Sequence, residues 1–427
     1  MKLSKLNPKK INFNDVDKNY SGQDILMKLG ELYQFESGIF GYGNIWTKME
    51  RIVENIIIDE LDKADCIQAE FPKLQPKKIW EQSGRWDVYT KEADIMFNMS
   101  NNLGDYGLAP TAEECATIFG ANRLLSYKNL PATYYQIGEK FRKEIRARGY
   151  LFRPRTFVMM DAYSFDKTPE DMHKNFEKMH DVYMRIFERI GINIIPVVSD
   201  GGTMGGRVSE EFQAITKLGE DIILYNEEKN VGINKEVLDF EDKETFIDRL
   251  QGLSLEDMKE YNSVELGNNF ELGTKYSEAM GLTYQDENGQ SKPYYMGCYG
   301  IGLGRIIATT IENNIIIKND RVKGFAIPEN IAPYKVQIIY SDENKEKAFE
   351  LYNKLQDNGV NAIIDDRENL NMGNRINDVY ALGTPYMLVM GKKFEDGKYE
   401  LETSKTGEKE VYTLDAVSYT HLRAHET

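Results

Sequence analysis

Residues 133–165 read TYYQIGEKFRKEIRARGYLFRPRTFVMMDAYSF, and this stretch decides the fold of the first part of the chain. Its two ends, TYYQIGEKF and TFVMMDAYSF, are rich in β-branched and aromatic residues, whereas its middle is hydrophilic and rich in arginine. This pattern predicts two antiparallel strands joined by an exposed loop. The middle, residues 140–155, holds seven basic residues and one acid. In a chain with a formal net charge of −16, so basic a segment indicates either an anionic ligand or a solvated surface.

Arg142 and Glu144 are two residues apart near the end of the first predicted strand, so their side chains should point to the same face. They could form a structural ion pair, or they could face a ligand together. A second motif, GIGLGR, favours the ligand. It places Gly300 and Gly302 where the backbone can pass close to a bound molecule, and Arg305 in the first turn of the next helix. Helix N-termini favour anions and an arginine there adds a directed charge, although such glycines are also common in turns without a ligand.

The composition limits the classes of protein to which the chain can belong. Of its 427 residues, 41% are hydrophobic and 29% are charged. This balance is typical of a soluble globular protein, with two or three domains at roughly 150 residues each. No apolar run approaches the roughly 18 residues of a transmembrane helix, and the N-terminus lacks the apolar core of a signal peptide. We therefore expect no membrane partner and a cytoplasmic location, and the acidic charge disfavours non-specific nucleic-acid binding by the whole chain.

The cysteines and the C-terminal residues carry no function in this interpretation. Cys66, Cys115 and Cys298 are odd in number and far apart, which argues against a disulfide framework or a CxxC zinc site. Residues 418–427 continue no earlier pattern, and we expect them to be a non-native tail.

The spacing of apolar residues divides the chain into two parts. Apolar residues recur every three or four positions over residues 44–65 and 169–190, which predicts two long amphipathic helices. The predicted buried stripe of the second helix is Met172, Phe176, Met179, Tyr183, Ile186 and Ile190. From about residue 328 strands and helices alternate, which is typical of an α/β domain with a mostly parallel sheet. The sequence therefore predicts an α+β protein, with residues 1–325 in one domain and residues 326–417 in another.

Together, these segments resemble motifs 2 and 3 of the class II aminoacyl-tRNA synthetases. The segments IWEQSGRW (79–86), APTAEE (109–114), FVMMDAYSF (157–165), FELGTKYSEAMG (270–281) and MGCYGIGLGR (296–305) are similar to the bacterial-type prolyl-tRNA synthetase family. Past residue 330, IAPYKVQII, IIDDREN, LGTPYMLVMGKK and GKYELETSKTGEKE resemble the anticodon-binding domain of that family. The resemblance runs in order over residues 15–417. It implies an antiparallel catalytic sheet flanked by helices, followed by an α/β anticodon-binding domain.

The resemblance also implies substrates and residue roles: ATP, proline and tRNA(Pro) as partners, with Mg²⁺ accompanying ATP. The implied catalytic residues are Arg142, Glu144 and Arg305. The implied ATP-binding residues are Arg142, Glu144, Arg153, Phe157, Glu211, Gly300, Gly302 and Arg305. The implied amino-acid-binding residues are Thr111, Glu113, Arg142, Asn268 and Cys298.

The chemistry implied for these residues is charge neutralisation and positioning. Arg142 would bind the α-phosphate while the amino-acid carboxylate displaces pyrophosphate, and Glu144 would help to fix the adenylate. Glu113 would pair with the charged nitrogen of proline. Phe157 would stack on adenine, and Glu211 stands where the family has an acid near the nucleotide and the metal.

The same resemblance implies contacts with tRNA and with a second copy of the chain. Arg146 and Arg148 would approach the acceptor end of the tRNA. The IIDDREN segment, with Asp365, Asp366 and Arg367, would read anticodon base edges, and its alternative is a solvated loop. The helix over residues 44–65 stands at the position of motif 1, which implies a homodimer; the alternative for this helix is an ordinary core role.

Three histidines that are usual in the family are replaced here, by Ala112, Glu210 and Asn268. We favour a divergent but active enzyme. The alternatives are a changed amino-acid specificity, a paralogue that binds tRNA without charging it, or a ligase that acts on something other than tRNA. Residues 226–263 form a short insertion, with the pattern of a small helical appendage, where many relatives carry an editing domain. We therefore expect misactivation of alanine, with a separate hydrolase needed to clear Ala-tRNA.

Overall fold

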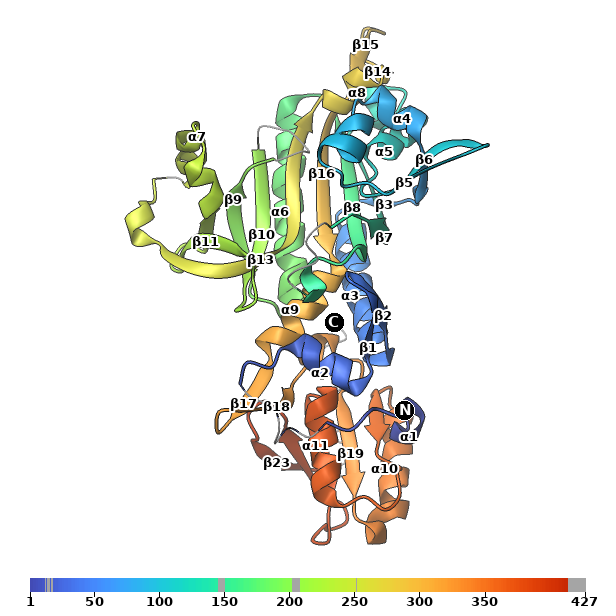
Figure 1. Ribbon diagram of the computed structural model, residues 1–427, viewed down its shortest axis with the longest axis vertical. Helices are drawn as coiled ribbons and strands as arrows, with labels where there is room; N and C mark the ends of the chain where they lie inside the picture. The colour runs from blue at the N-terminus through green and yellow to red at the C-terminus, as the bar shows by residue number, and fades with distance from the viewer. Residues whose placement is uncertain are drawn as a thin grey trace. The chain divides into compact units, whose positions relative to one another are not determined.

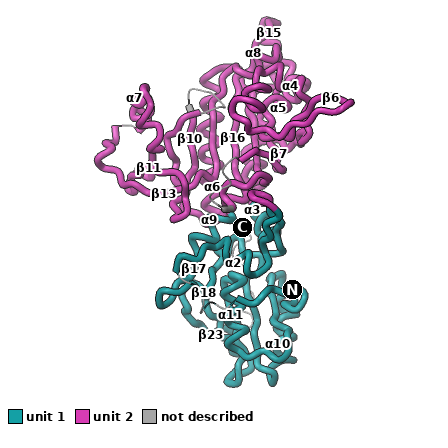
Figure 2. Tube along the Cα trace, in the orientation of Figure 1, with its two compact units in different colours: residues 1–35, 40–53, 307–427 teal, residues 36–39, 54–306 magenta. Residues whose placement is uncertain are grey.

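The computed structural model describes residues 1–413, apart from residues 12, 14–15, 17, 145–149, 202–207 and 251. The chain divides into two compact units (Figure 2). The smaller unit comprises residues 1–35, 40–53 and 307–427, and the larger unit comprises residues 36–39 and 54–306. Residues 418–427, the predicted non-native tail, lie outside the described residues. In the described part of the chain, no helix is long and apolar enough to cross a membrane.

A large sheet forms the centre of the larger unit (Figure 1). Counted over the described residues, it has nine strands in the order β10, β9, β12, β11, β13, β16, β8, β7 and β3. Their bounds in this order are Val208–Ile215, Ile195–Ser199, Val231–Asn234, Asp221–Asn226, Lys259–Gly273, Tyr295–Gly302, Thr156–Asp166, Ala132–Phe141 and Ile67–Gln68. β9 and β12 run parallel, as do β3 and β7, and the other neighbours are antiparallel. The predicted antiparallel architecture is confirmed.

The predicted hairpin is β7 and β8. Phe141 lies opposite Thr156, so residues 142–155 form the connection between the two strands. β8 is buried continuously from its fifth residue to its end, rather than at alternate positions. β8 lies in the interior of the sheet, paired with β16 on one side and β7 on the other.

Helix α6 (Pro169–Ile190) packs against β8, β13 and β16. Thr168 caps its start by accepting a hydrogen bond from the Asp171 N–H at 3.2 Å, and Gly191 ends it with a left-handed φ of 85°. All six residues of the predicted stripe are buried. The other long predicted helix is α3 (Asn44–Lys63), two residues shorter than expected at its C-terminal end. Further elements of the larger unit are β4 (Leu74–Pro76), α4 (Lys77–Gln82), β5 (Asn98–Asn101), β6 (Gly104–Leu108), α5 (Glu113–Ala121), α8 (Lys275–Ala279), β14 (Thr283–Gln285) and β15 (Ser291–Pro293).

The short insertion at residues 226–263 is only partly an appendage. Its strand β12 lies inside the main sheet, between β9 and β11, and β13 begins within it at Lys259. Helix α7 (Lys243–Ile247) and three short 3₁₀ turns make up the helical part that the sequence predicted. Their apolar side chains pack with Val198, Ile233, Val237 and Leu250 in a small core of their own.

The smaller unit contains the α/β region predicted from residue 328 onward. Its sheet has the order β20, β19, β21, β22 and β23 over the described residues. Their bounds in this order are Ala362–Ile364, Val336–Tyr340, Tyr386–Met390, Tyr399–Thr403 and Lys409–Tyr412, with helices α10 (Lys345–Asp357) and α11 (Met372–Leu382). The first three strands are parallel, as predicted, whereas β22 and β23 add an antiparallel edge. Other elements of this unit are α1 (Leu3–Leu6), α2 (Gly22–Leu29), β17 (Ile315–Lys318) and β18 (Arg321–Phe325).

Candidate active site

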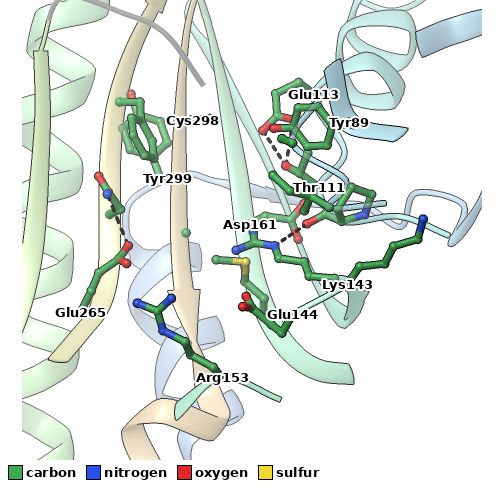
Figure 3. Close-up of a pocket in the computed structure, with 18 of the residues that line it drawn as sticks. Tyr89, Thr111, Glu113, Lys143, Glu144, Arg153, Asp161, Glu265, Cys298 and Tyr299 are labelled. Carbon is green, nitrogen blue, oxygen red and sulfur yellow. Dashed lines mark hydrogen bonds between the residues drawn. The ribbon is translucent and has the colours of Figure 1, made fainter. Parts of the chain in front are cut away.

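A cavity of about 610 Å³ opens on the sheet of the larger unit, where the β7–β8 connection meets β13 and β16 (Figure 3). A second cavity of about 110 Å³ adjoins it and shares Arg153 and Glu265 with it. The predicted ATP- and amino-acid-binding residues that line the two cavities are Thr111, Glu113, Arg142, Glu144, Arg153, Glu211, Asn268, Cys298, Gly300 and Arg305. Of the predicted set, only Phe157 and Gly302 do not line them.

Arg142 directly follows β7. Its backbone N–H donates to the Arg155 carbonyl at 3.0 Å, which closes the base of the connection. Its Nε donates to the Pro110 carbonyl at 3.3 Å, and its guanidinium lies 5.2 Å from the centroid of the Phe157 ring. The Glu144 N–H donates to the Arg142 carbonyl at 2.8 Å. Arg142 and Glu144 therefore both face the cavity, while the Phe157 ring lies beneath the guanidinium.

Two further arginines face acids beside this point. Arg153 Nε lies 2.5 Å from a carboxylate oxygen of Glu220. Arg305 stands in the first turn of α9 (Leu303–Asn313), where its Nη1 lies 3.1 Å from Glu265 and its Nε donates to the Phe152 carbonyl at 2.9 Å. The predicted phosphate-binding arginines are thus gathered at the junction of the two cavities, and those at 153 and 305 each hold a carboxylate.

Gly300 and Gly302 of the GIGLGR motif lie in strand β16, rather than in a turn. Gly300 lines the larger cavity, and a Cβ at this position would come within 2.8 Å of Met159 Cε. A Cβ at Gly302 would make only ordinary contacts, at 3.6 Å or more, with Arg305. Of these two glycines, Gly300 alone lines a cavity.

The smaller cavity is rich in carboxylates. Its acidic residues are Glu211, Glu220, Asp221, Glu236 and Glu265. Burial, followed by the charge of Glu265, raises the pKa of Glu211 to about 8. Oxygen donors are the ligands that Mg²⁺ prefers, and a bound cation would relieve this crowding of negative charge. Within the described ranges, no three acidic, histidine or cysteine side chains are arranged to hold a metal by themselves.

Glu113 begins helix α5 and is held from two sides. The Thr111 hydroxyl lies 2.7 and 2.8 Å from its two carboxylate oxygens. Arg85 Nη1 donates to Glu113 Oε2 at 2.9 Å and to Glu114 Oε1 at 3.1 Å. Arg85 Nη2 also donates to the Tyr89 hydroxyl. Figure 3 shows Glu113, Thr111 and Tyr89 close together, with Arg153 and Glu144 in another part of the cavity. Arg85 belongs to the segment IWEQSGRW, but no sequence pattern predicts its contacts with Glu113 and Glu114.

A second network missed from the sequence surrounds Asp161 on β8. Lys140 Nζ lies 2.6 Å from Asp161 Oδ1, and both side chains are almost fully buried. Gln136 Nε2 and the Tyr163 hydroxyl each donate to Asp161 Oδ2 at 2.8 Å. The alternation of side chains along a strand was the available signal. Residues 136 and 140 are an even number of residues apart on β7, and so are residues 161 and 163 on β8, so each pair shares a face of its strand.

The structure separates the three positions where family histidines are replaced. Ala112 does not line the cavity; its N–H donates to the Tyr163 hydroxyl at 3.0 Å and its methyl packs in the core. Glu210 faces α6, where it bonds His180 Nδ1 at 2.8 Å. Asn268 alone lines the cavity, accepting from the Ser209 hydroxyl at 3.1 Å and donating to Glu265 at 3.3 Å. Near it, burial raises the pKa of the Cys298 thiol well above its usual value.

Of the residues predicted to contact tRNA, the structure describes those of the IIDDREN segment only. Arg146 and Arg148 lie outside the described residues. In the smaller unit, the Asp365 side chain is fully buried between Arg367 and Arg375, at 2.8 and 3.2 Å. Arg367 also bonds Asp378, and Asp366 accepts from the Ser4 N–H and hydroxyl at 2.8 and 2.6 Å. The buried Asp365 carboxylate therefore holds two arginines in this structure. Neither sequence interpretation, contact with anticodon bases or a solvated loop, describes this role.

Comparisons with known proteins agree along the chain. The tRNA synthetase class II core domain (G, H, P, S and T) matches residues 91–314, and an anticodon binding domain matches residues 332–420. The proline–tRNA ligase of Sulfurimonas denitrificans is 34% identical over 412 residues, covering 92% of each chain. That of Rickettsia bellii is 33% identical over 403 residues, covering 92% of this chain and 91% of its own. That of Bacillus subtilis is 27% identical over 550 residues, covering 94% and 96%.

The fold is also found among solved structures. Prolyl-tRNA synthetase from Cryptosporidium parvum, complexed with L-proline and AMP, superposes with a TM-score of 0.73 at 17% identity, covering 95% of this chain and 75% of the other.

Proposed function

Because the chain belongs to the prolyl-tRNA synthetase family of class II aminoacyl-tRNA synthetases, we propose that it activates proline with ATP and transfers the prolyl group to the 3′ end of tRNA(Pro). One observation carries the proposal. A single cavity brings a buried carboxylate suited to a substrate cation, Glu113, together with Arg142, a cation suited to a phosphate. These are the two charges that a zwitterionic amino acid and ATP require.

The proposed reaction needs little covalent chemistry from the protein. A carboxylate oxygen of proline attacks the α-phosphorus of ATP, and the bond to the departing pyrophosphate breaks. Arg142 would neutralise the charge that gathers at the α-phosphate, and Glu144 beside it would help to hold the adenylate. Arg153 and Arg305 would bind the outer phosphates, exchanging their present partners Glu220 and Glu265 for phosphate oxygens.

Mg²⁺ fits the acidic cavity beside these arginines. Protein sites for Mg²⁺ commonly supply only one or two carboxylates and leave the remaining positions to phosphates and water. Glu211 is the candidate ligand, because its carboxyl is buried and stands near the negative charges of Glu265 and Asp221, which together with burial raise its pKa. Mg²⁺ bound there would neutralise phosphate charge.

The remaining assignments complete the proposal. Residues 1–325 would form the catalytic domain and residues 326–417 the anticodon-binding domain, with the family matches over 91–314 and 332–420 in support. Arg146 and Arg148 would approach the tRNA acceptor end, and Asp366 and Arg367 the anticodon. A homodimer through the region of α3 and a cytoplasmic location go with this assignment.

We also propose that the chain lacks an editing activity. The alignment with the Bacillus subtilis relative spans 550 residues, more than the 427 of this chain, so that relative holds segments absent here. The insertion at residues 226–263 supports this, because its strands belong to the main sheet and its helical part is small.

The decisive test is ATP–pyrophosphate exchange with each amino acid in turn. We expect proline to dominate, and Arg142→Ala to reduce the proline-dependent rate by roughly a hundredfold or more, because a transition-state charge contact is lost. Lys128→Ala, an exposed position in the same unit, is the matched control. Exchange with another amino acid would indicate a changed specificity, and none at all would indicate a tRNA-binding paralogue. Exchange with proline but no charging of tRNA(Pro) would indicate a different acceptor.

A further inference from the structure

Three charged side chains meet behind the part of the cavity where Thr111 and Glu113 lie. Arg85, Glu113 and Glu114 have side-chain exposures of 5%, 2% and 0%. Only Glu113 of the three lines the cavity. We call Arg85, Glu113 and Glu114 the carboxylate triad.

The geometry of the triad is fixed by aromatic rings. The Arg85 guanidinium lies 5.0, 4.4 and 5.2 Å from the ring centroids of Trp80, Tyr89 and Tyr276. A planar guanidinium held between rings keeps its orientation, and lysine could not replace its fork. The Ser83 hydroxyl donates at 2.7 Å to Glu114 Oε1, the same oxygen that Arg85 Nη1 holds.

The triad has an unbalanced charge. One guanidinium faces two carboxylates, which leaves a formal charge of −1 on these three groups; the partly buried Lys275 ammonium is a further cation whose pKa the charges of Glu113 and Glu114 influence. Burial raises the pKa of Glu114, and the Arg85 charge opposes that rise. The charges of Glu114 and Glu113 in turn raise the pKa of Arg85 well above the usual arginine value, although burial alone would lower it. Of the two carboxylates only Glu113 lines the cavity, so a bound ligand meets the charge of the triad through Glu113.

We propose that Arg85 is a positioning residue for the substrate: shared between Glu113 and Glu114, it holds the Glu113 carboxylate in place and aimed at the cationic nitrogen of the bound imino acid. This inference rests on the proposed function of the cavity as a proline site. The bound cation completes the triad to a neutral group of four charges. Recognition of the substrate nitrogen then depends on the charge balance of the triad, in addition to the one carboxylate that touches it.

Each partner of Glu113 has a distinct effect in this arrangement. Without Arg85, two buried carboxylates would share the space, and one of them would take up a proton or move. Without the Glu114 charge, Arg85 would pair with Glu113 alone and neutralise it. Removing both charges would restore the formal −1 on Glu113, now without its orienting partner.

The test is a charge series measured by ATP–pyrophosphate exchange, with KM determined separately for proline and for ATP. The formal triad charge is −1 in the unmodified protein, −2 in Arg85→Gln, 0 in Glu114→Gln and −1 in the double variant. We expect each single variant to raise the KM for proline roughly tenfold or more, since a buried charged contact is disturbed, while the KM for ATP changes by less than about threefold. The KM for proline of the double variant should return a large part of the way to that of the unmodified protein.

Arg123→Gln, an exposed arginine just after α5, is the matched control for loss of an arginine near Glu113. The inference is overturned if the KM values for proline and ATP rise in parallel, or if the double variant is as weak as the worse single variant. If Arg85→Gln does not fold, Glu114→Gln decides alone: an unchanged KM for proline overturns the inference. Absence of proline-dependent exchange in the unmodified protein would instead overturn the proposed function, and this inference with it.

Discussion

At the scale of single residues, Asn268 connects the two cavities. Its amide lines the larger cavity and donates to Glu265, which lines both cavities and pairs with Arg305. Its carbonyl oxygen accepts from Ser209 on the neighbouring strand. A substitution at this position therefore affects both the candidate amino-acid site and an arginine proposed to bind phosphate.

We expect Asn268→Ala to raise the KM for proline by roughly 5- to 30-fold, because two hydrogen bonds worth about 1–2 kcal/mol together are lost in a buried setting. Ser209→Ala removes only one of these bonds, so its effect should be smaller. Proline-dependent exchange at varied proline concentration measures both. Equal KM values for Asn268→Ala and the unmodified protein would show that this amide does not support the proline site.

Sequence patterns could identify functional residues that belong to one continuous motif. They could not identify residues whose contacts come from a distant segment of the chain. Arg142 and Arg305 follow from the basic hairpin loop and the strand-to-helix junction, and both line the cavities. Arg85 could not be assigned in this way, because its role depends on Glu113 and Glu114 reaching it from another segment of the chain. The burial of Asp365 has the same cause: its partner Arg375 stands on a helix ten residues further on.

At the scale of elements, α6 is tied to the sheet by two histidine–glutamate pairs as well as by its apolar stripe. His173 Nδ1 lies 2.6 Å from Glu271, and His180 Nδ1 lies 2.8 Å from Glu210. The hydrogen bond to Glu210 raises the pKa of His180 above its ordinary value of 6.5, against the effect of burial. The pair on β10 is therefore sensitive to pH.

Since the His180 pKa is higher in the folded state than in the unfolded state, its pairing with Glu210 stabilises the fold fully below about pH 6.5 and loses that contribution as pH rises through the raised value. We expect Glu210→Gln to lower the free energy of unfolding by roughly 0.5–1 kcal/mol at acid pH, the scale of a partly exposed pair, and by little at alkaline pH. Thermal melts at about pH 6 and pH 9 measure this. A difference that persists at the higher pH would point to Arg249, whose pKa is also influenced by Glu210.

Predictions of secondary structure were confirmed where one periodicity ran over many residues, as in α6. They failed for short strands that gain their place by pairing with other segments of the chain. β12 has only four residues and gains its place from pairing with β9 and β11. β22 did carry a signal, because Tyr399 and Leu401 are buried and alternate with glutamates. The α/β alternation of the neighbouring segments predicts parallel strands, so the antiparallel edge was not predicted.

At the scale of the whole molecule, the chain combines a synthetase core and an anticodon-binding domain within 427 residues. Under the proposal that the chain lacks an editing activity, discrimination between proline and a smaller amino acid would depend on the binding cavity alone. A hydrophobic contact that differs by a methylene or two supplies only about 1–3 kcal/mol.

We therefore expect the purified protein to support exchange with alanine at a rate roughly 10- to 200-fold below that with proline, and to leave preformed Ala-tRNA(Pro) intact. The second measurement is the half-life of Ala-tRNA(Pro) with and without the protein, with Pro-tRNA(Pro) as the control. Rapid deacylation of the alanyl form alone would show that the chain edits its own product, and a trans-acting hydrolase would not be required.

The guanidinium of Arg142 lies over the ring of Phe157, at 5.2 Å from its centroid. The resemblance implies that adenine stacks on this ring, and a base on the face that the guanidinium covers would displace a cation, at a cost of about 0.5–2 kcal/mol. The affinity for nucleotide would then be a net quantity, the strength of base stacking less that of the contact it displaces. The same exchange would free the guanidinium for an arriving phosphate, so that competition for one ring face would link occupancy of the base site to readiness of the reacting site.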